Sequence, residues 1–237
     1  MHSLHRPYEN AEPAGIRPSR SDFQWTDAVT VQLAELLQKN VLEGEAHMEH
    51  KGTVTLETER LVLRRFQLDD APAMYRNWAG DGEVTKYLTW PTHKNVEVSE
   101  KILSEWIGQY DRPDFYNWAI VIKEAGEVIG NISVVSIQEK AELVHIGYCI
   151  SRSRWRQGIT SEALGELIRF LFEEVHAGCI SSRHDPRNPN SGKVMKKCGM
   201  KYDGTLRHSD WNNQGICDAS YYSILREEYE ARKKEAG

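Results

Sequence analysis

The most regular pattern of apolar and polar positions in the chain spans about residues 158–176. Apolar side chains recur there at intervals of three and four, the spacing of one helix face, and charged side chains occupy the opposite face. The apolar set consists of Ala163, Leu164, Leu167, Ile168, Leu171, Phe172 and Val175. The pattern predicts an amphipathic helix with one buried side.

The segments before this helix have the pattern of strands. Residues 143–150 are almost continuously apolar, as expected for a strand covered on both faces. Residues 118–123 and 128–137 are two further strand candidates, and Gly126 between them readily adopts the positive φ of a tight turn. We therefore expect a β-hairpin followed by a buried strand.

Shorter patterns complete the prediction on either side. Further strands are expected at residues 61–66, 179–183, 200–207 and 216–225, and further helices at about residues 69–78, 98–110 and 191–197 and in a tail that runs through Lys234. The central strand, helix and strand predict a right-handed parallel crossover, whereas the hairpins are antiparallel. The predicted fold class is thus α/β (α+β), with a mixed, mostly antiparallel sheet of about seven strands flanked by helices.

Residues 1–50 differ in composition from the rest of the chain. Prolines and Gly15 disfavour regular structure before residue 22, after which Val29, Leu33, Leu36, Leu37 and Val41 have the spacing of an amphipathic helix. That helix can dock on the remaining chain or on another subunit, or the segment can be a remnant of an expression tag, with Met48 as an alternative start. We expect a partly disordered extension at residues 1–50 and one domain at residues 51–237.

The charge balance narrows the range of partners. The chain has 237 residues, with 30 Lys and Arg against 35 Asp and Glu, for a net charge of −5. A surface that neutralises many phosphates has the opposite balance, so we expect no nucleic-acid partner. No apolar run approaches the roughly 20 residues that span a bilayer, and no signal-peptide pattern is present, so we expect a cytoplasmic protein without a membrane partner.

The four cysteines give no sign of a metal site or a disulfide framework. Cys149, Cys179, Cys198 and Cys217 are scattered, without a CxxC pair or the Cys/His spacing that suits zinc. We expect reduced thiols and no bound metal. Core packing is the common role of such residues, with a cysteine nucleophile as the alternative.

The segment between the buried strand and the strongest helix is the first candidate for chemistry. A helix N-terminus offers unpaired N–H groups and partial positive charge, and Gly158 allows the backbone to approach a phosphate closely. Arg154 and Arg156 add positive charge. The loop suits a diphosphate, although a simple turn with two solvated arginines has the same composition.

The surrounding residues extend this loop into a recognisable pattern. Residues 146–150 followed by residues 155–163 resemble the acyl-CoA-binding core of the GCN5-related N-acetyltransferase (GNAT) superfamily. Residues 188–200 are similar to the motif after that family's fifth strand, and residues 56–64 and 202–207 resemble strands of its RimJ/RimL-like branch of ribosomal-protein N-acetyltransferases. The resemblance covers about residues 54–229 and implies the GNAT fold, whose central parallel pair is splayed.

The resemblance implies a site for acetyl-CoA, the acyl donor. In that family the backbone N–H groups that correspond to residues 157–161 hold the pyrophosphate, with Arg156 alongside, and the pantetheine arm pairs with the main chain at the splay. The donor-binding residues implied are Tyr148, Cys149, Ile150, Arg156, Gln157, Gly158, Ile159, Thr160, Ser161 and Asn188. The sequence departs from the common pattern at Trp155, where many members carry Gln or Arg.

The implied reaction is attack of a neutral amine on a thioester, which needs a base, an oxyanion site and a proton donor to the thiolate. Ser191 matches a serine proposed as that donor in RimL-like enzymes, although a serine at the start of a helix is also a common cap. His145 stands where many relatives carry a catalytic Glu, and a structural role is its alternative. Glu142 is a second candidate base, and Tyr148 and Tyr202 are further candidate acids.

The acceptor is the least determined part of the prediction. Aromatic residues concentrate in the helices expected to form its pocket, but most suit core packing, and Trp90 and Trp211 are the candidate substrate-binding residues. The resemblance implies an acetyl-CoA-dependent N-acetyltransferase that acts on a protein N-terminal α-amine, with a small amine such as a polyamine, amino acid or antibiotic as an alternative. A non-catalytic acyl-CoA sensor is a further alternative, and a homodimer is common among relatives.

Overall fold

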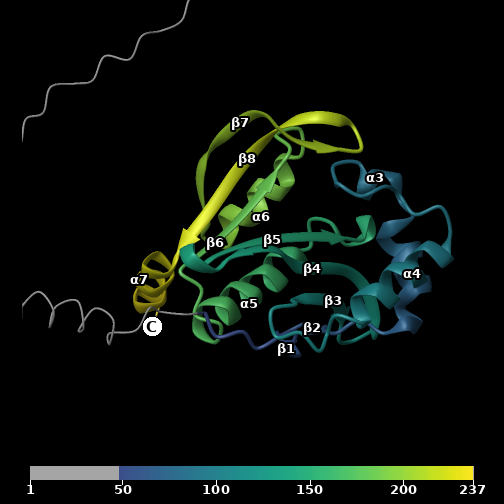
Figure 1. Cartoon of the computed structure of the whole chain (residues 1–237), viewed down its shortest axis with the longest axis horizontal. Helices are drawn as coiled ribbons and strands as arrows, with labels where there is room; N and C mark the ends of the chain where they lie inside the picture. The colour runs from purple at the N-terminus through teal and green to yellow at the C-terminus, as the bar shows by residue number, and fades with distance from the viewer. Residues whose placement is uncertain (1–47, 237) are drawn as a thin grey trace, which may run out of the picture. The chain divides into compact units, whose positions relative to one another are not determined.

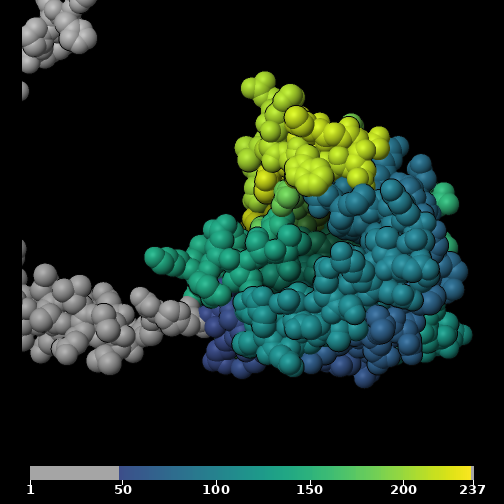
Figure 2. Space-filling model, turned by 45° about the vertical axis from the view of Figure 1, so that its right-hand side comes forward, coloured from purple at the N-terminus to yellow at the C-terminus, as the bar shows by residue number. Residues whose placement is uncertain are grey.

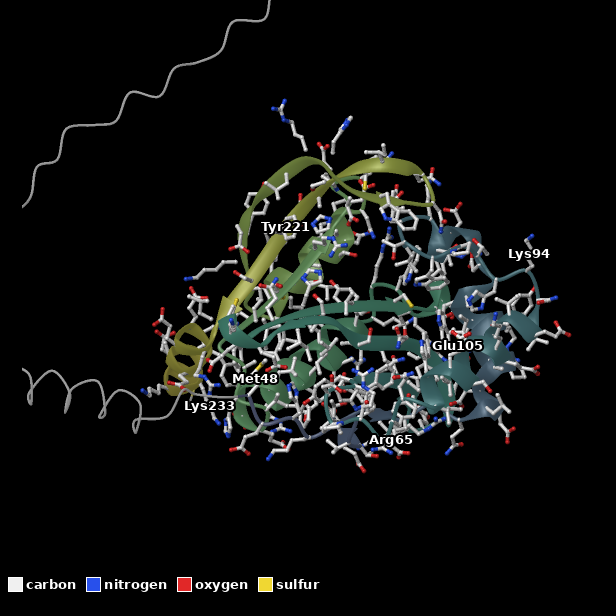
Figure 3. The ribbon with its side chains drawn as sticks, in the orientation of Figure 1. Met48, Arg65, Lys94, Glu105, Tyr221 and Lys233 are labelled. Atoms are coloured by element: carbon white, nitrogen blue, oxygen red, sulfur yellow. The ribbon has the colours of Figure 1, made fainter. Side chains whose placement is uncertain are left out.

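The structure, a computed structural model, describes residues 48–236. The helix expected near residues 29–41 lies outside these residues. The described chain begins with Met48, whose side chain is buried in the main hydrophobic core, as Figure 3 shows. None of the helices in this part of the chain has the length and apolar character that crossing a bilayer requires.

An eight-stranded sheet runs through the domain in the order β1-β2-β3-β4-β5-β6-β8-β7 (Figure 1). Every neighbouring pair is antiparallel except β5 and β6. The strands are β1 (Leu56–Glu57), β2 (Leu61–Arg64), β3 (Asn117–Ile122), β4 (Glu127–Gln138), β5 (Leu143–Ile150), β6 (Cys179–His184), β7 (Lys201–Asn212) and β8 (Gly215–Leu225). The predicted mixed sheet with one parallel pair is confirmed, and the short β1 raises the expected seven strands to eight.

Helices cover both faces of this sheet because alternate residues of its strands point to opposite sides. On β3, Trp118 and Ile120 join the core cluster that contains α5 (Ile159–Glu173), whereas Ala119 and Val121 join the cluster beneath α2 (Ala71–Met74) and α4 (Val96–Ile107). All four of these β3 side chains are buried. The helix predicted near residues 158–176 is thus confirmed as the central packing element of one face.

The expected helix at residues 69–78 is divided into three segments. A short 3₁₀ turn, η1 (Leu68–Asp70), leads into α2, and a π-helical turn, η2 (Tyr75–Ala79), follows it. The N–H of Gly80 donates to the carbonyl of Tyr75 at 2.9 Å, a spacing of five residues that widens the helix. Trp78 nevertheless lies fully buried, as expected from its position on the apolar side.

The loop after η2 contains the short helix α3 (Gly82–Thr85), which the sequence pattern did not predict. Asp81 caps it by accepting a hydrogen bond from the N–H of Glu83 at 2.9 Å. The β7–β8 hairpin is longer than predicted, and its far end lies beside α3 (Figure 1). This arrangement brings residues near position 85 next to residues near position 213.

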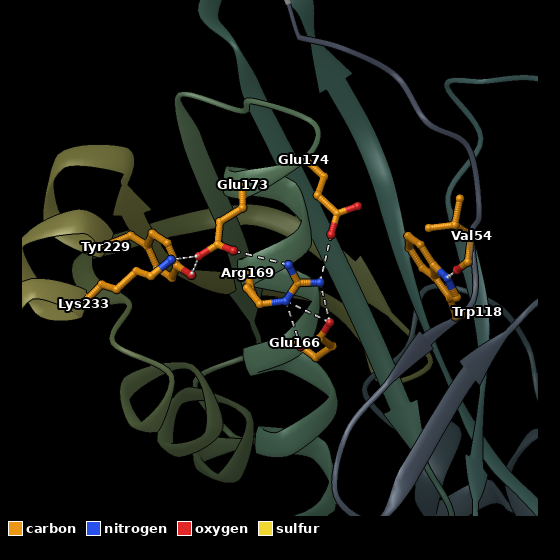
Figure 4. Close-up of polar contacts among 8 residues, drawn as sticks. All are labelled: Val54, Trp118, Glu166, Arg169, Glu173, Glu174, Tyr229 and Lys233. Atoms are coloured by element: carbon orange, nitrogen blue, oxygen red, sulfur yellow. Dashed lines mark hydrogen bonds and ion pairs between the residues drawn. The ribbon is translucent and has the colours of Figure 1, made fainter. Parts of the chain in front are cut away.

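The last helix, α7 (Arg226–Ala236), is fastened to the C-terminal end of α5. The ring of Tyr229 stacks on Phe172, with centroids 5.1 Å apart, and Lys233 Nζ lies 2.5 Å from a carboxylate oxygen of Glu173. Arg169 pairs with Glu166, Glu173 and Glu174 on its own side of the helix, as Figure 4 shows. The predicted helical tail therefore has a defined place in the fold.

Candidate active site

The candidate site begins where the two parallel strands separate. β5 and β6 are paired only from Leu143 to His145, opposite residues 179–181. One further contact follows, in which the hydroxyl of Ser182 donates to the carbonyl of Ile146 at 2.9 Å. A bulge in β4 at Val135 faces this point and bends the sheet. The rest of β5 and β6 diverges and leaves a gap between buried strands.

The N-terminus of α5 lies at the mouth of this gap. Gly158 is its N-cap with φ +76°, and Arg156 also has a positive φ of 61°. The first helical bond runs from the N–H of Glu162 to the carbonyl of Gly158 at 3.0 Å. Among the described residues no acceptor contacts the N–H groups of residues 157–161. These groups form a concave donor surface of the kind that binds phosphate.

Positive side chains surround this surface. Arg156, Lys193 and Lys197 line the same cavity, and a Cβ placed on Gly158 lies 3.6 Å from both Lys197 Nζ and a guanidinium nitrogen of Arg60. Arg154 also lines the cavity but is paired with Glu127 at 2.6 Å. The helix N-terminus and these cations together favour a ligand with several negative charges.

We call the N–H groups of residues 157–161 the phosphate cradle. A first cavity of about 350 Å³ extends from this cradle to the splayed strands. All the residues expected to hold the donor line it except Gln157, whose side chain is exposed and donates to the carbonyl of Ser153 at 2.9 Å. The Trp155 indole also lines the cavity and donates to the carbonyl of Ile150 at 3.0 Å. Trp155 thereby closes the end of β5. The residue at which the sequence departs from the common family pattern therefore has a structural role.

A second cavity of about 150 Å³ lies on the other side of the splay. It is bounded by the loop that follows α3, by β5 and β6, and by the β7–β8 hairpin. Leu88, Tyr148, Asn188 and Ser191 line both cavities. The two cavities therefore adjoin at these four residues.

Ser191 is the third residue of α6 (Pro189–Lys197), because the helix begins two residues earlier than the sequence pattern indicated. Asn188 occupies the N-cap position, so Ser191 does not cap the helix. The Asn188 amide instead donates to the Ser191 hydroxyl oxygen at 3.1 Å, which leaves the hydroxyl proton free for another acceptor. The phenol of Tyr148 donates to the backbone carbonyl of Ser191 at 3.0 Å and holds this turn against β5.

His145 lies in the second cavity within a chain of polar contacts. Its Nε2 accepts a hydrogen bond from Arg183 at 2.9 Å, and Arg183 is paired with Asp210 at 2.6 Å. Since a guanidinium only donates, the proton of the neutral imidazole lies on Nδ1, which donates to the hydroxyl of Ser181 at 2.9 Å. Burial, together with the charge of Arg183, lowers the pKa of His145 to about 4. Its expected role as a base therefore requires Arg183 to move away from Nε2.

The other candidate acids and bases lie in less suitable places. Glu142 ends the 3₁₀ turn η3 (Glu139–Ala141) in a left-handed conformation, and its carboxylate lies beside Gly178, outside both cavities. Tyr202 is exposed on β7, and its hydroxyl contacts Thr205 at 2.7 Å. Burial raises the pKa of the Cys149 thiol to about 12, so this cavity-lining cysteine stays a thiol.

The two acidic residues of the second cavity are neutralised by arginines. Although burial alone would raise their pKa values, Arg187 lowers the pKa of Asp185 to about 2, and Arg183 holds that of Asp210 below its usual range. Asp185 also accepts a hydrogen bond from Asn212 at 2.8 Å, which ties the hairpin to the β6–α6 loop. The described lining of this cavity therefore offers no unpaired carboxylate to a polycation.

The two tryptophans predicted on the substrate side have different positions. Trp211 lines the second cavity and is 58% exposed, so a ligand there can contact its ring. Trp90 lines neither cavity; its ring packs near His93, with centroids 5.5 Å apart, and its carbonyl accepts a hydrogen bond from Asn213. Trp90 therefore lies outside both cavities, and its substrate-binding role stays a prediction.

Several site residues were not singled out from the sequence. Arg183 follows the expected strand pattern and gives no local sign of its contacts with His145 and Asp210. Lys193 and Lys197 did carry a signal, since residues four apart on a helix share a face and both lie within the motif at residues 188–200. No group of three or more His, Cys, Asp or Glu residues suited to a metal occurs within residues 48–236.

Comparison with known proteins places the chain in a family. Residues 60–201 match the model of the acetyltransferase (GNAT) domain. The chain is 31% identical to the uncharacterized N-acetyltransferase p20 of Bacillus licheniformis over 74% of its own length and 98% of that protein. It is 28% identical to the ribosomal-protein-serine acetyltransferase of Escherichia coli, over 58% and 76% of the two chains.

A solved structure shares the same architecture. The GNAT-family acetyltransferase of Bacillus anthracis superimposes with a TM-score of 0.66 at 23% identity, over 73% of this chain and 99% of that one. The family match spans the splayed strands β5 and β6 and the open N-terminus of α5, all of which lie within residues 60–201. The chain belongs to the GNAT family of N-acetyltransferases, whose members use acetyl-CoA.

Proposed function

We propose that this N-acetyltransferase transfers the acetyl group of acetyl-CoA to the α-amine of a protein N-terminus. The observation that carries the proposal is the meeting of two cavities at Tyr148, Asn188 and Ser191, with unpaired N–H groups at the far end of the larger one. The pyrophosphate of the donor fits the N-terminus of α5, and its pantetheine arm fits the splay beside Tyr148, Cys149 and Ile150. Asn188 contacts the arm near the thioester.

Direct transfer needs no covalent enzyme intermediate. The neutral amine attacks the thioester carbon, the carbon–sulfur bond breaks, the Ser191 hydroxyl gives its proton to the departing thiolate, and the nitrogen releases a proton to water. Asn188 positions Ser191 for this role because it donates to the hydroxyl oxygen and leaves the hydroxyl proton available. Water then returns a proton to Ser191.

The electrostatics of the second cavity support an α-amine rather than a more basic acceptor. His145 has a pKa of about 4 and its lone pair faces Arg183, so it is a weak base at neutral pH. An α-amine with a pKa near 8 is already neutral in about one molecule in ten at pH 7, against about one in 2,500 for a lysine-like amine. The paired carboxylates likewise disfavour a polyamine.

The Escherichia coli relative is named a ribosomal-protein-serine acetyltransferase, which supports a protein as the acceptor. The test is thiol release from acetyl-CoA with two peptides that share one sequence. One has a free N-terminus and an acetylated lysine, and the other has an acetylated N-terminus and a free lysine. We expect turnover with the first peptide only. Turnover with the second alone would contradict the proposal, and CoA binding by calorimetry without turnover would favour the sensor alternative.

A further inference from the structure

The tip of the β7–β8 hairpin is attached to the loop that follows α3 by one residue. The backbone N–H of Asn213 donates to the carbonyl of Leu88 at 3.2 Å. The side-chain amide of Asn213 donates to the carbonyls of Thr85 and Trp90, both at 2.8 Å. Asn213 thus uses all three of its N–H donors to hold residues 85–90. In Figure 2, yellow atoms of the hairpin meet the blue part of the chain.

The two segments joined by Asn213 are opposite walls of the second cavity. Tyr87, Leu88 and Thr89 line it from the loop, and Asp210, Trp211, Asn212 and Cys217 line it from the hairpin. The hairpin is itself anchored, because Asn212 donates to Asp185 in the β6–α6 loop at 2.8 Å. The contacts of Asn213 therefore set the distance between the loop and a fixed wall.

The other end of the same loop is attached to the donor side of the site. Arg152, in the turn before α5, pairs with Asp81 at 3.0 Å, and Asp81 caps α3. Leu88, whose carbonyl accepts the Asn213 N–H, lines both cavities. With the Asp81 end held, a change at Asn213 alters the acceptor wall and leaves the phosphate cradle in place.

We propose that Asn213 determines acceptor size by closing the loop of residues 85–90 against the β7–β8 hairpin. This inference rests on the proposed function, because it concerns the amine that enters the second cavity. The closed bridge admits an N-terminus with a small first side chain and excludes a bulky one. Loss of the bridge lets the loop move outward and relaxes that selection.

Two variants break the bridge in different ways. Asn213→Ala removes the amide, and Asn213→Asp keeps nearly the same volume but turns a carboxylate toward two carbonyl oxygens. Gln214→Ala is the matched control, since Gln214 lies in the same turn and its side chain hydrogen-bonds only to the Asn213 carbonyl, at 3.2 Å, among the described residues. Hydrogen–deuterium exchange over residues 85–93 reports whether the loop is released while the rest of the domain stays protected.

The measured quantity is the ratio of kcat/KM for a peptide that begins with tryptophan to that for the same peptide beginning with serine. We expect this ratio to rise about tenfold in both Asn213 variants, with CoA affinity and the Gln214→Ala ratio unchanged. An unchanged ratio, or unchanged exchange in the loop, overturns the size selection. If the native protein acetylates neither of these peptides, the proposed function fails, and the same ratio measured with two free amines, tryptamine and ethanolamine, still tests the size selection by itself.

Discussion

The phenol of Tyr148 on β5 donates a 3.0 Å hydrogen bond to the backbone carbonyl of Ser191 on α6. The bond spans the splay and joins the strand that lines the donor cavity to the helix turn that carries the proposed proton donor. Burial raises the pKa of this phenol, so it keeps its proton throughout the physiological range. Because its proton is held by the Ser191 carbonyl, we expect Tyr148 to position Ser191.

Substitution of Tyr148 by phenylalanine tests this relationship. The variant removes one hydrogen bond and leaves the ring in place, so we expect kcat to fall about tenfold through misplacement of Ser191. The KM for acetyl-CoA should change little, because the phosphate cradle is untouched. A loss of kcat by a factor of a thousand or more would instead identify Tyr148 as the acid.

Ser191→Ala removes the proposed proton donor directly. We expect kcat to fall about a hundredfold, within the range for loss of a general acid, with unchanged CoA affinity. Ser223→Ala is a suitable control, since Ser223 on β8 bonds to Asp203 at 2.9 Å and lines neither cavity. Equal activity of the two variants would remove Ser191 from the mechanism.

The pH dependence of the reaction separates the acceptor from His145. The neutral form of the acceptor reacts, so kcat/KM should rise with pH and level off near the α-amine pKa of about 8. His145→Gln should keep that limb, because the pKa of His145 is near 4 and its neutral form already prevails above pH 5. Disappearance of the limb in this variant would show that His145 is the base.

Gly158 tests the phosphate cradle. Its φ of +76° at the N-cap of α5 is strained for any residue with a Cβ, although the space around it is open to 3.6 Å. Gly158→Ala should shift the backbone N–H groups beside it and weaken CoA binding about tenfold. Gly126→Ala provides a control with the same kind of conformation, φ +62°, in a turn between β3 and β4. Calorimetric titration of both variants with CoA measures the difference.

The lowered pKa of Glu173 makes part of the folding stability of the domain depend on pH. Hydrogen bonds from Lys233, Tyr229 and Arg169 lower its pKa to about 2 from the usual value of 4.5. A lowered pKa in the folded state stabilises the fold above pH 4.5, and this contribution disappears as the pH falls from 4.5 toward 2. Because the group is partly exposed, Glu173→Gln should cost at most about 1 kcal/mol at pH 7. Urea unfolding should show a difference between native and variant protein that is full at pH 7, smaller at pH 3 and absent near pH 2.

The sequence by itself determined most of the regular elements and the likeness that identified the family. The periodicity at residues 158–176 defined α5, and the apolar run at residues 143–150 defined β5, because burial of one helix face or of both strand faces is recorded locally in the side chains. The loop between them marked the phosphate cradle for the same reason, since a helix N-terminus is a local feature.

Only the tertiary structure decided the partners of the polar groups. His145 and Arg183 are 38 residues apart, and Asn213 and Thr85 are 128 residues apart, so no local pattern records either contact. The fold lowers the basicity of His145 by burying it beside a guanidinium. The helix α6 begins two residues earlier than the sequence pattern indicated, and Ser191 lines both cavities. These effects depend on which strands neighbour one another in space, and side-chain periodicity along the chain carries no record of that order.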